Sequence, residues 1–116
     1  ARVAASRGHA VTLFEASGFQ LEVACDGSEA LDAVRSPTPY DLVLLDIVMP
    51  VASGLEVLSE LRGLEHRSEV PVIVLTAKGQ DADRERAFAL GASAFITKPF
   101  SPKKLLNQVD ALLAGR

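Results

Sequence analysis

Short runs of apolar residues recur along the chain and predict the strands of a sheet. Such runs occupy residues 41–46, 70–77 and 94–97, and a weaker, alternating run occupies residues 19–24. Apolar runs without alternation are typical of strands that are covered on both faces, as in a parallel sheet.

Between these runs, apolar residues repeat at helical spacing. The pattern covers residues 28–35, 54–62, 81–90 and the stretch from Ser101 to the chain end. Ser28 is expected to cap the first helix, and Gly63 and Gly91 are expected stop signals. Strand and helix therefore alternate, which predicts βαβ units in a doubly wound parallel sheet.

The first eighteen residues fit this pattern poorly. Residues 1–6 are compatible with a weak strand, and residues 4–16 are compatible with a helix that contains Gly8. Neither alternative has strong support. The length allows one hydrophobic core, so we expect a single domain over residues 1–116.

Composition excludes several classes of protein. Hydrophobic residues make up 48% of the chain and charged residues 23%, a balance typical of a soluble globular domain. The net charge of −3 offers no basic surface, so we expect no direct contact with nucleic acid or membrane. The longest nearly apolar run, residues 70–77, is too short to span a bilayer, and we expect a cytoplasmic protein. One cysteine excludes an internal disulfide, and two histidines exclude a multi-histidine metal centre.

Three polar residues stand at or just past the ends of predicted strands: Asp46, Thr76 and Lys98. In open parallel sheets, ligands gather at the carboxyl ends of the strands. A carboxylate can act as a nucleophile toward phosphorus, while a hydroxyl and an ammonium offset the charge of phosphoryl oxygens. Each residue alone is more often a turn or surface residue, but the three together favour a phosphoryl site.

The chain resembles the receiver domains of response regulators. Residues 44–50 (LLDIVMP), followed by Gly54, resemble the phosphoacceptor motif of that family. Thr76 lies 30 residues after Asp46, and Lys98, which opens a Lys-Pro-Phe motif, lies 52 residues after it; both offsets match the family. The resemblance extends from about residue 18 to the end. It implies a flavodoxin-like sheet with strand order 2-1-3-4-5.

The resemblance also implies a function in two-component signalling rather than metabolism. Asp46 would accept a phosphoryl group from a histidine kinase or phosphotransfer protein, with Thr76 and Lys98 contacting it. Phe95 stands at the position of the family's switch aromatic. The surface of the fourth helix, fifth strand and fifth helix would then change for an output domain or for a second copy. As an enzyme, the domain would at most catalyse its own phosphotransfer and dephosphorylation.

The N-terminus departs from the family pattern. Receiver domains carry an acidic pair after an apolar first strand, yet residues 1–3 are Ala-Arg-Val, and an alternative alignment places Ala5 and Ser6 there. Neither alignment supplies a carboxylate, so only Asp46 and the Val48 carbonyl remain as implied Mg²⁺ ligands. We therefore expect weak Mg²⁺ binding and slow or absent phosphorylation.

The first strand itself is expected to be missing, degenerate or supplied otherwise. Its position in the sheet could be filled by residues 2–6, by an upstream segment, by a second copy of the chain or by a rearranged sheet. The retention of three site residues favours sequence before Ala1 over a loss of function.

Three other functions compete with a working receiver. A degenerate receiver would act as an interaction module that never accepts phosphate, which the absent acidic pair favours. An aspartate-nucleophile phosphatase would need a second acid two residues after Asp46, where Val48 stands. A nucleotide- or flavin-binding domain would need a glycine-rich phosphate loop, and none follows any predicted strand.

Overall fold

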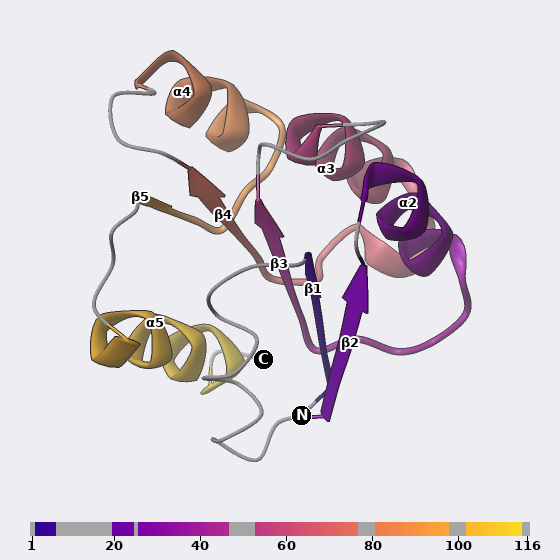
Figure 1. Cartoon of the computed structure of the whole chain (residues 1–116), viewed down its shortest axis with the longest axis horizontal. Helices are drawn as coiled ribbons and strands as arrows, with labels where there is room; N and C mark the ends of the chain where they lie inside the picture. Colours follow the sequence, from indigo (N-terminus) through magenta and orange to yellow (C-terminus); the bar gives the residue numbers. More distant parts are fainter. Residues whose placement is uncertain are drawn as a thin grey trace.

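The computed structural model describes residues 2–6, 20–24, 26–46, 53–76, 81–97 and 102–114. Within these residues, five parallel strands form one sheet in the order β2-β1-β3-β4-β5 (Figure 1). The strands are β1 (Arg2–Ser6), β2 (Gln20–Ala24), β3 (Leu42–Asp46), β4 (Val72–Thr76) and β5 (Ala94–Thr97). This is the strand order that the resemblance to receiver domains implies.

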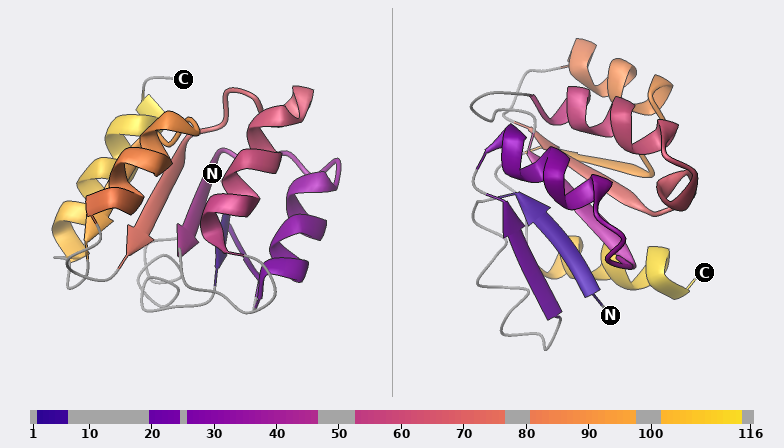
Figure 2. Two further views of the ribbon diagram at one scale, coloured as in Figure 1. Left: turned by 90° about the horizontal axis from the view of Figure 1, so that it is seen from above. Right: turned by 90° about the vertical axis from the view of Figure 1, so that its right-hand side faces the viewer.

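Helices cover both faces of the sheet. They are α2 (Gly27–Arg35), α3 (Gly54–Gly63), the short 3-10 helix η1 (Glu65–Arg67), α4 (Asp81–Ala89) and α5 (Pro102–Ala114). Figure 2 shows α2, α3 and α4 on one side of the sheet and α5 on the other. The doubly wound, flavodoxin-like fold is therefore confirmed. Among the described helices, none has the length and apolar character that a membrane crossing requires.

The residues of β3 show why its sequence does not alternate. Val43 and Leu45 are buried on the face covered by α2, α3 and α4, whereas Leu42 and Leu44 are buried on the face covered by α5. All four side chains are at most 2% exposed. Burying one such side chain contributes about 1.5–3 kcal/mol, so both faces hold β3 at the centre of the molecule.

The expectation of a missing first strand is wrong, and the alternative of a degenerate strand is confirmed. Arg2–Ser6 forms β1, which pairs in parallel with β2 on one side and with β3 on the other. Val3 is fully buried and Ala5 is 4% exposed, both on the α5 face. Strand pairing uses the backbone, so a strand with small side chains can occupy this central position. For residues 4–6 the structure excludes the alternative of a helix over residues 4–16, and the remainder of that range lies outside the described residues.

The start of α2 also differs from the prediction. Asp26, not Ser28, is the N-cap, and its side chain accepts a hydrogen bond of 2.9 Å from the backbone N–H of Glu29. Ser28 lies inside the helix and is exposed. At the end of α4, Gly91 has the positive φ of 104° that the predicted glycine stop signal implies.

Candidate functional site

The carboxyl ends of β3, β4 and β5 lie side by side at one edge of the sheet. Asp46 is the last residue of β3 and is in register with Leu75 of β4. Thr76, the last residue of β4, is in register with Thr97, the last residue of β5. The structure therefore brings the backbones of Asp46 and Thr76 to the same edge, as the strand pattern predicts.

Two of the predicted site residues lie outside the described part of the chain. Lys98 follows Thr97 directly in the sequence, so the chain enters it from the same edge. Val48, the expected carbonyl ligand of Mg²⁺, lies two residues past the end of β3. For Thr76, the structure describes the position of the backbone in β4.

Asp46 is positioned by the strand that precedes it. Residues 42–45 are fully buried between the two helical layers, and Asp46 is the first residue of β3 that is partly exposed. A buried, paired strand leaves its last residue little backbone freedom. The carboxylate is therefore carried on a rigid element at the edge of the sheet, where solvent reaches it.

The described residues do not by themselves make a magnesium site. Mg²⁺ binds oxygen ligands and commonly uses one or two carboxylates. Ala5, at one of the positions where the family's acidic pair is expected, is a buried methyl side chain and offers no ligand oxygen. Asp26 near the end of β2 already accepts a hydrogen bond as a helix cap. Among the described residues, no group of three or more His, Cys, Asp or Glu side chains could hold a metal.

Phe95 lies between the interior and the surface of α4. It is half-buried on β5 and packs against the cluster on the α2–α4 face. Its ring centroid is 6.4 Å from that of Phe88, with the rings tilted by 45°. Phe88 is 44% exposed, and the guanidinium of Arg84 lies 5.8 Å from its ring centroid. A change in the position of the Phe95 ring would therefore act directly on Phe88 at the outer surface of α4.

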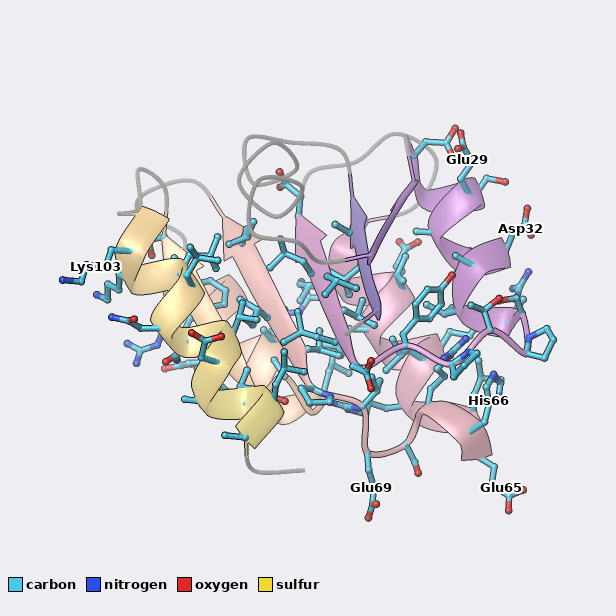
Figure 3. The ribbon with its side chains drawn as sticks, turned by 90° about the horizontal axis from the view of Figure 1, so that it is seen from below. Glu29, Asp32, Glu65, His66, Glu69 and Lys103 are labelled. Carbon is cyan, nitrogen blue, oxygen red and sulfur yellow. The ribbon has the colours of Figure 1, made fainter. Side chains whose placement is uncertain are left out.

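Sequence reasoning missed two arginines at the opposite edge of the sheet. Arg67 of η1 is 2% exposed, and Arg62 in the last turn of α3 contacts several backbone carbonyls. Burial lowers the pKa of the Arg62 guanidinium. Nearby, the Nε2 atom of His66 lies 3.0 Å from the carbonyl oxygen of Ser36, and Figure 3 shows His66 beside the end of α2. Charged residues are usually solvated, so no local signal in the sequence marks Arg67 as buried or Arg62 as a partner of backbone carbonyls.

Comparison with known proteins bears on the family and the fold of the chain. Residues 4–110 match the model of the response regulator receiver domain. The chain is 43% identical over 102 residues to the transcriptional regulatory protein CpxR homolog of Haemophilus influenzae, covering 88% of this chain and 43% of that relative. The chain thus spans less than half the length of this relative.

Solved structures of similar fold cover nearly the whole chain. The chemotaxis protein CheY4 of Vibrio cholerae superposes with a TM-score of 0.85 at 26% identity, over 97% of this chain and 98% of that one. The receiver domain of the sensor histidine kinase PA1611 from Pseudomonas aeruginosa, whose structure has a magnesium ion coordinated in the active-site cleft, superposes with a TM-score of 0.86 at 24% identity, over 97% of both chains. Strand order, sheet edge and family match agree, and the chain belongs to the response regulator receiver domains of two-component signalling.

Proposed function

We propose that the chain is a receiver domain, over residues 1–116, that accepts a phosphoryl group on Asp46 from a histidine kinase or a phosphotransfer protein. The observation that carries this proposal is the position of Asp46, partly exposed at the carboxyl end of the central strand β3 and next to the end of β4. A carboxylate oxygen of Asp46 bonds to phosphorus while the bond from phosphorus to the donor's histidine nitrogen breaks. That nitrogen keeps the bonding electron pair and takes up a proton from solvent.

Thr76 and Lys98 are the proposed partners of the phosphoryl group. Thr76 ends the strand next to Asp46, and Lys98 follows the end of β5. A phosphoryl group adds a charge of about −1.5 to −2 and new acceptor oxygens, which a hydroxyl and an ammonium both satisfy. Movement of Thr76 toward these oxygens frees space into which Phe95 turns.

The proposed output of this change is the surface formed by α4, β5 and α5. Phe88 and Arg84 already form an exposed aromatic and cationic pair there, in contact with Phe95. The partner is an output domain or a second copy of the chain. The name of the CpxR homolog, a transcriptional regulatory protein more than twice the length of this chain, supports an output domain. The proposed location of this signalling is the cytoplasm.

Magnesium binding is proposed to be weak. The PA1611 receiver domain has a magnesium ion in its active-site cleft, but Ala5 and Ser6 at the carboxyl end of β1 supply no carboxylate to this edge. The same observation favours the second candidate function, a degenerate receiver that acts as an interaction module without phosphorylation. We propose the working receiver first because Asp46, Thr76 and Lys98 are all present.

Mass spectrometry of the chain after incubation with a small phosphodonor and magnesium tests this function. We expect one phosphoryl adduct on the natural chain, slow to form and dependent on the magnesium concentration, and none on Asp46→Asn. Asp110→Asn is the matched control, because Asp110 is an exposed carboxylate on α5. An adduct of equal size on Asp46→Asn would show that Asp46 is not the acceptor. No adduct on any of the three proteins would support the degenerate receiver.

A further inference from the structure

Arg62 joins three segments of the chain at the edge of the sheet opposite Asp46. It lies in the last turn of α3, and its Nε and Nη2 atoms donate to the carbonyl oxygen of Gly91 at 3.0 and 2.8 Å. Its Nη1 atom donates to the carbonyl oxygen of Val70 at 2.7 Å and to those of Arg67 and Ser68 at 3.0 and 3.3 Å. One guanidinium thus connects the end of α3, the segment before β4 and the turn between α4 and β5.

Gly91 is shaped to receive this guanidinium. Its φ of +104° is a conformation that residues with a side chain rarely adopt. A Cβ atom at this position would also stand 2.9 Å from the Arg62 Nε atom and 3.1 Å from its Cγ atom. The turn and the arginine therefore fit together only while residue 91 is glycine.

The rest of the turn between α4 and β5 is hydrogen-bonded to α4 and to β4. The N–H of Ala92 donates to the carbonyl oxygen of Ala87 in α4 at 2.9 Å. The N–H of Ser93 donates to the carbonyl oxygen of Val72 at 2.9 Å, and the Ser93 hydroxyl accepts from the Val72 N–H at 3.1 Å. The carboxyl end of α4 is therefore held against the start of β4, with Arg62 beneath it.

This turn separates the two aromatic residues of the proposed switch. Phe88 precedes it in the last turn of α4, Phe95 follows it on β5, and their rings are in contact. The relative position of the rings depends on how firmly the turn is held. A displacement that begins near the end of β4 can then move α4 only about its fixed carboxyl end.

We propose that Arg62 is a positioning residue of the switch, which fixes the turn between α4 and β5 and so couples Phe95 to the surface of α4. The proposal rests on the proposed function, because the coupled signal is the one that starts at Asp46. Arg62 contacts the segment before β4, whereas Asp46 lies beside the carboxyl end of β4, so loss of Arg62 leaves the phosphoryl site itself in place.

The first measurement needs no ligand. In Arg62→Met, we expect the backbone amides of Ala92 and Ser93 to exchange with solvent about tenfold to a hundredfold faster than in the natural chain, the factor that a hydrogen bond to a charged group contributes. Arg62→Lys keeps the charge but lacks the fork of donors, and it should fall between the two. Gly91→Ala should loosen the same amides, because a side chain there strains the positive φ of the turn and also meets the Arg62 guanidinium. Arg35→Met, which removes an exposed arginine of α2, is the matched control and should leave these amides unchanged.

The second measurement adds magnesium and beryllofluoride, a mimic of the phosphoryl group, and follows the bound ligand by fluorine NMR. We expect Arg62→Met to saturate within about twofold of the concentration that the natural chain needs, as for independent sites. When beryllofluoride binds, the chemical shifts of the backbone amides of Arg84 and Phe88 should change by about half as much as in the natural chain, or less. The reason is that a loosened turn no longer holds α4 and β5 in one arrangement.

The outcomes separate this proposal from the proposed function. Full shift changes at Arg84 and Phe88 in Arg62→Met, or unaltered exchange of Ala92 and Ser93, would overturn the positioning role. If the natural chain does not bind beryllofluoride, the proposed function fails, and with it the coupling. The exchange experiment would then report only whether Arg62 holds the turn.

Discussion

Arg67 is a buried cation whose partners are the carbonyl groups at the end of a helix. Its Nε atom donates to the carbonyl oxygen of Val34 at 3.0 Å, and its Nη2 atom donates to that of Ser36 at 2.9 Å. The guanidinium also lies 4.6 Å from the centroid of the Tyr40 ring. The last carbonyl groups of a helix lack partners within the helix and carry partial negative charge. Arg67 therefore supplies hydrogen-bond donors to the last carbonyl groups of α2, and their negative charge stabilises its guanidinium.

Substitution of Arg67 should therefore cost far more than substitution of an exposed arginine. We expect Arg67→Met to lower the free energy of unfolding by about 2–4 kcal/mol, because it leaves buried carbonyl groups without donors. Arg67→Lys should recover part of this loss, since an ammonium cannot reproduce the planar fork. Urea unfolding measures both values, with Arg86→Met on the exposed side of α4 as control, expected within about 0.5 kcal/mol of the natural chain. Equal stability of Arg67→Met and Arg86→Met would contradict this role.

At the scale of secondary structure, the sequence predicts most elements closely because their signals are local. The predicted helix over residues 54–62 is α3 (Gly54–Gly63), and the predicted strand over residues 94–97 is β5. The predicted cap of α2, Ser28, is wrong, because Asp26 is also a good capping residue and lies only two positions earlier. Only the backbone geometry distinguishes them, since Asp26 has an extended conformation with φ of −150° and faces the N–H of Glu29.

A pair of alanine variants distinguishes these two candidates. Asp26→Ala should lower the free energy of unfolding by about 1 kcal/mol, because it removes the acceptor of the Glu29 N–H and a negative charge at the positive end of α2. Ser28→Ala should be neutral or slightly stabilising, since Ser28 is an exposed position inside the helix and alanine has the higher helix propensity. Thermal unfolding of the two variants under identical conditions gives the comparison. A larger loss of stability for Ser28→Ala than for Asp26→Ala would show that Ser28, and not Asp26, caps α2.

At the scale of the whole molecule, the sheet edge could be predicted from the sequence but the first strand, β1, could not. Asp46 and Thr76 end two predicted neighbouring strands, and parallel strands share their carboxyl edge, so their placement follows from topology. The burial of β1 depends instead on neighbours that are distant in the sequence. Val3 and Ala5 are covered by side chains such as Leu105 and Val109 of α5, and an alanine-rich segment carries no local sign of such partners.

The buried position of Ala5 leads to a prediction about the whole sheet. One alignment of the family pattern puts residue 5 at the acidic pair, whereas the structure puts its side chain in the core beneath α5 at 4% exposure. Ala5→Asp therefore places a carboxylate among apolar side chains and should lower the free energy of unfolding by roughly 2 kcal/mol or more. Added magnesium should restore none of this loss, because the new carboxylate lies in the core under α5 and not at the exposed edge of the sheet. If residue 5 instead faced the magnesium site, Ala5→Asp would be tolerated and magnesium would raise the unfolding temperature.

Ala111→Asp on the exposed surface of α5 provides the control for the added charge. Unfolding of both variants with and without magnesium therefore reports whether residue 5 of β1 lies in the core or at the magnesium site.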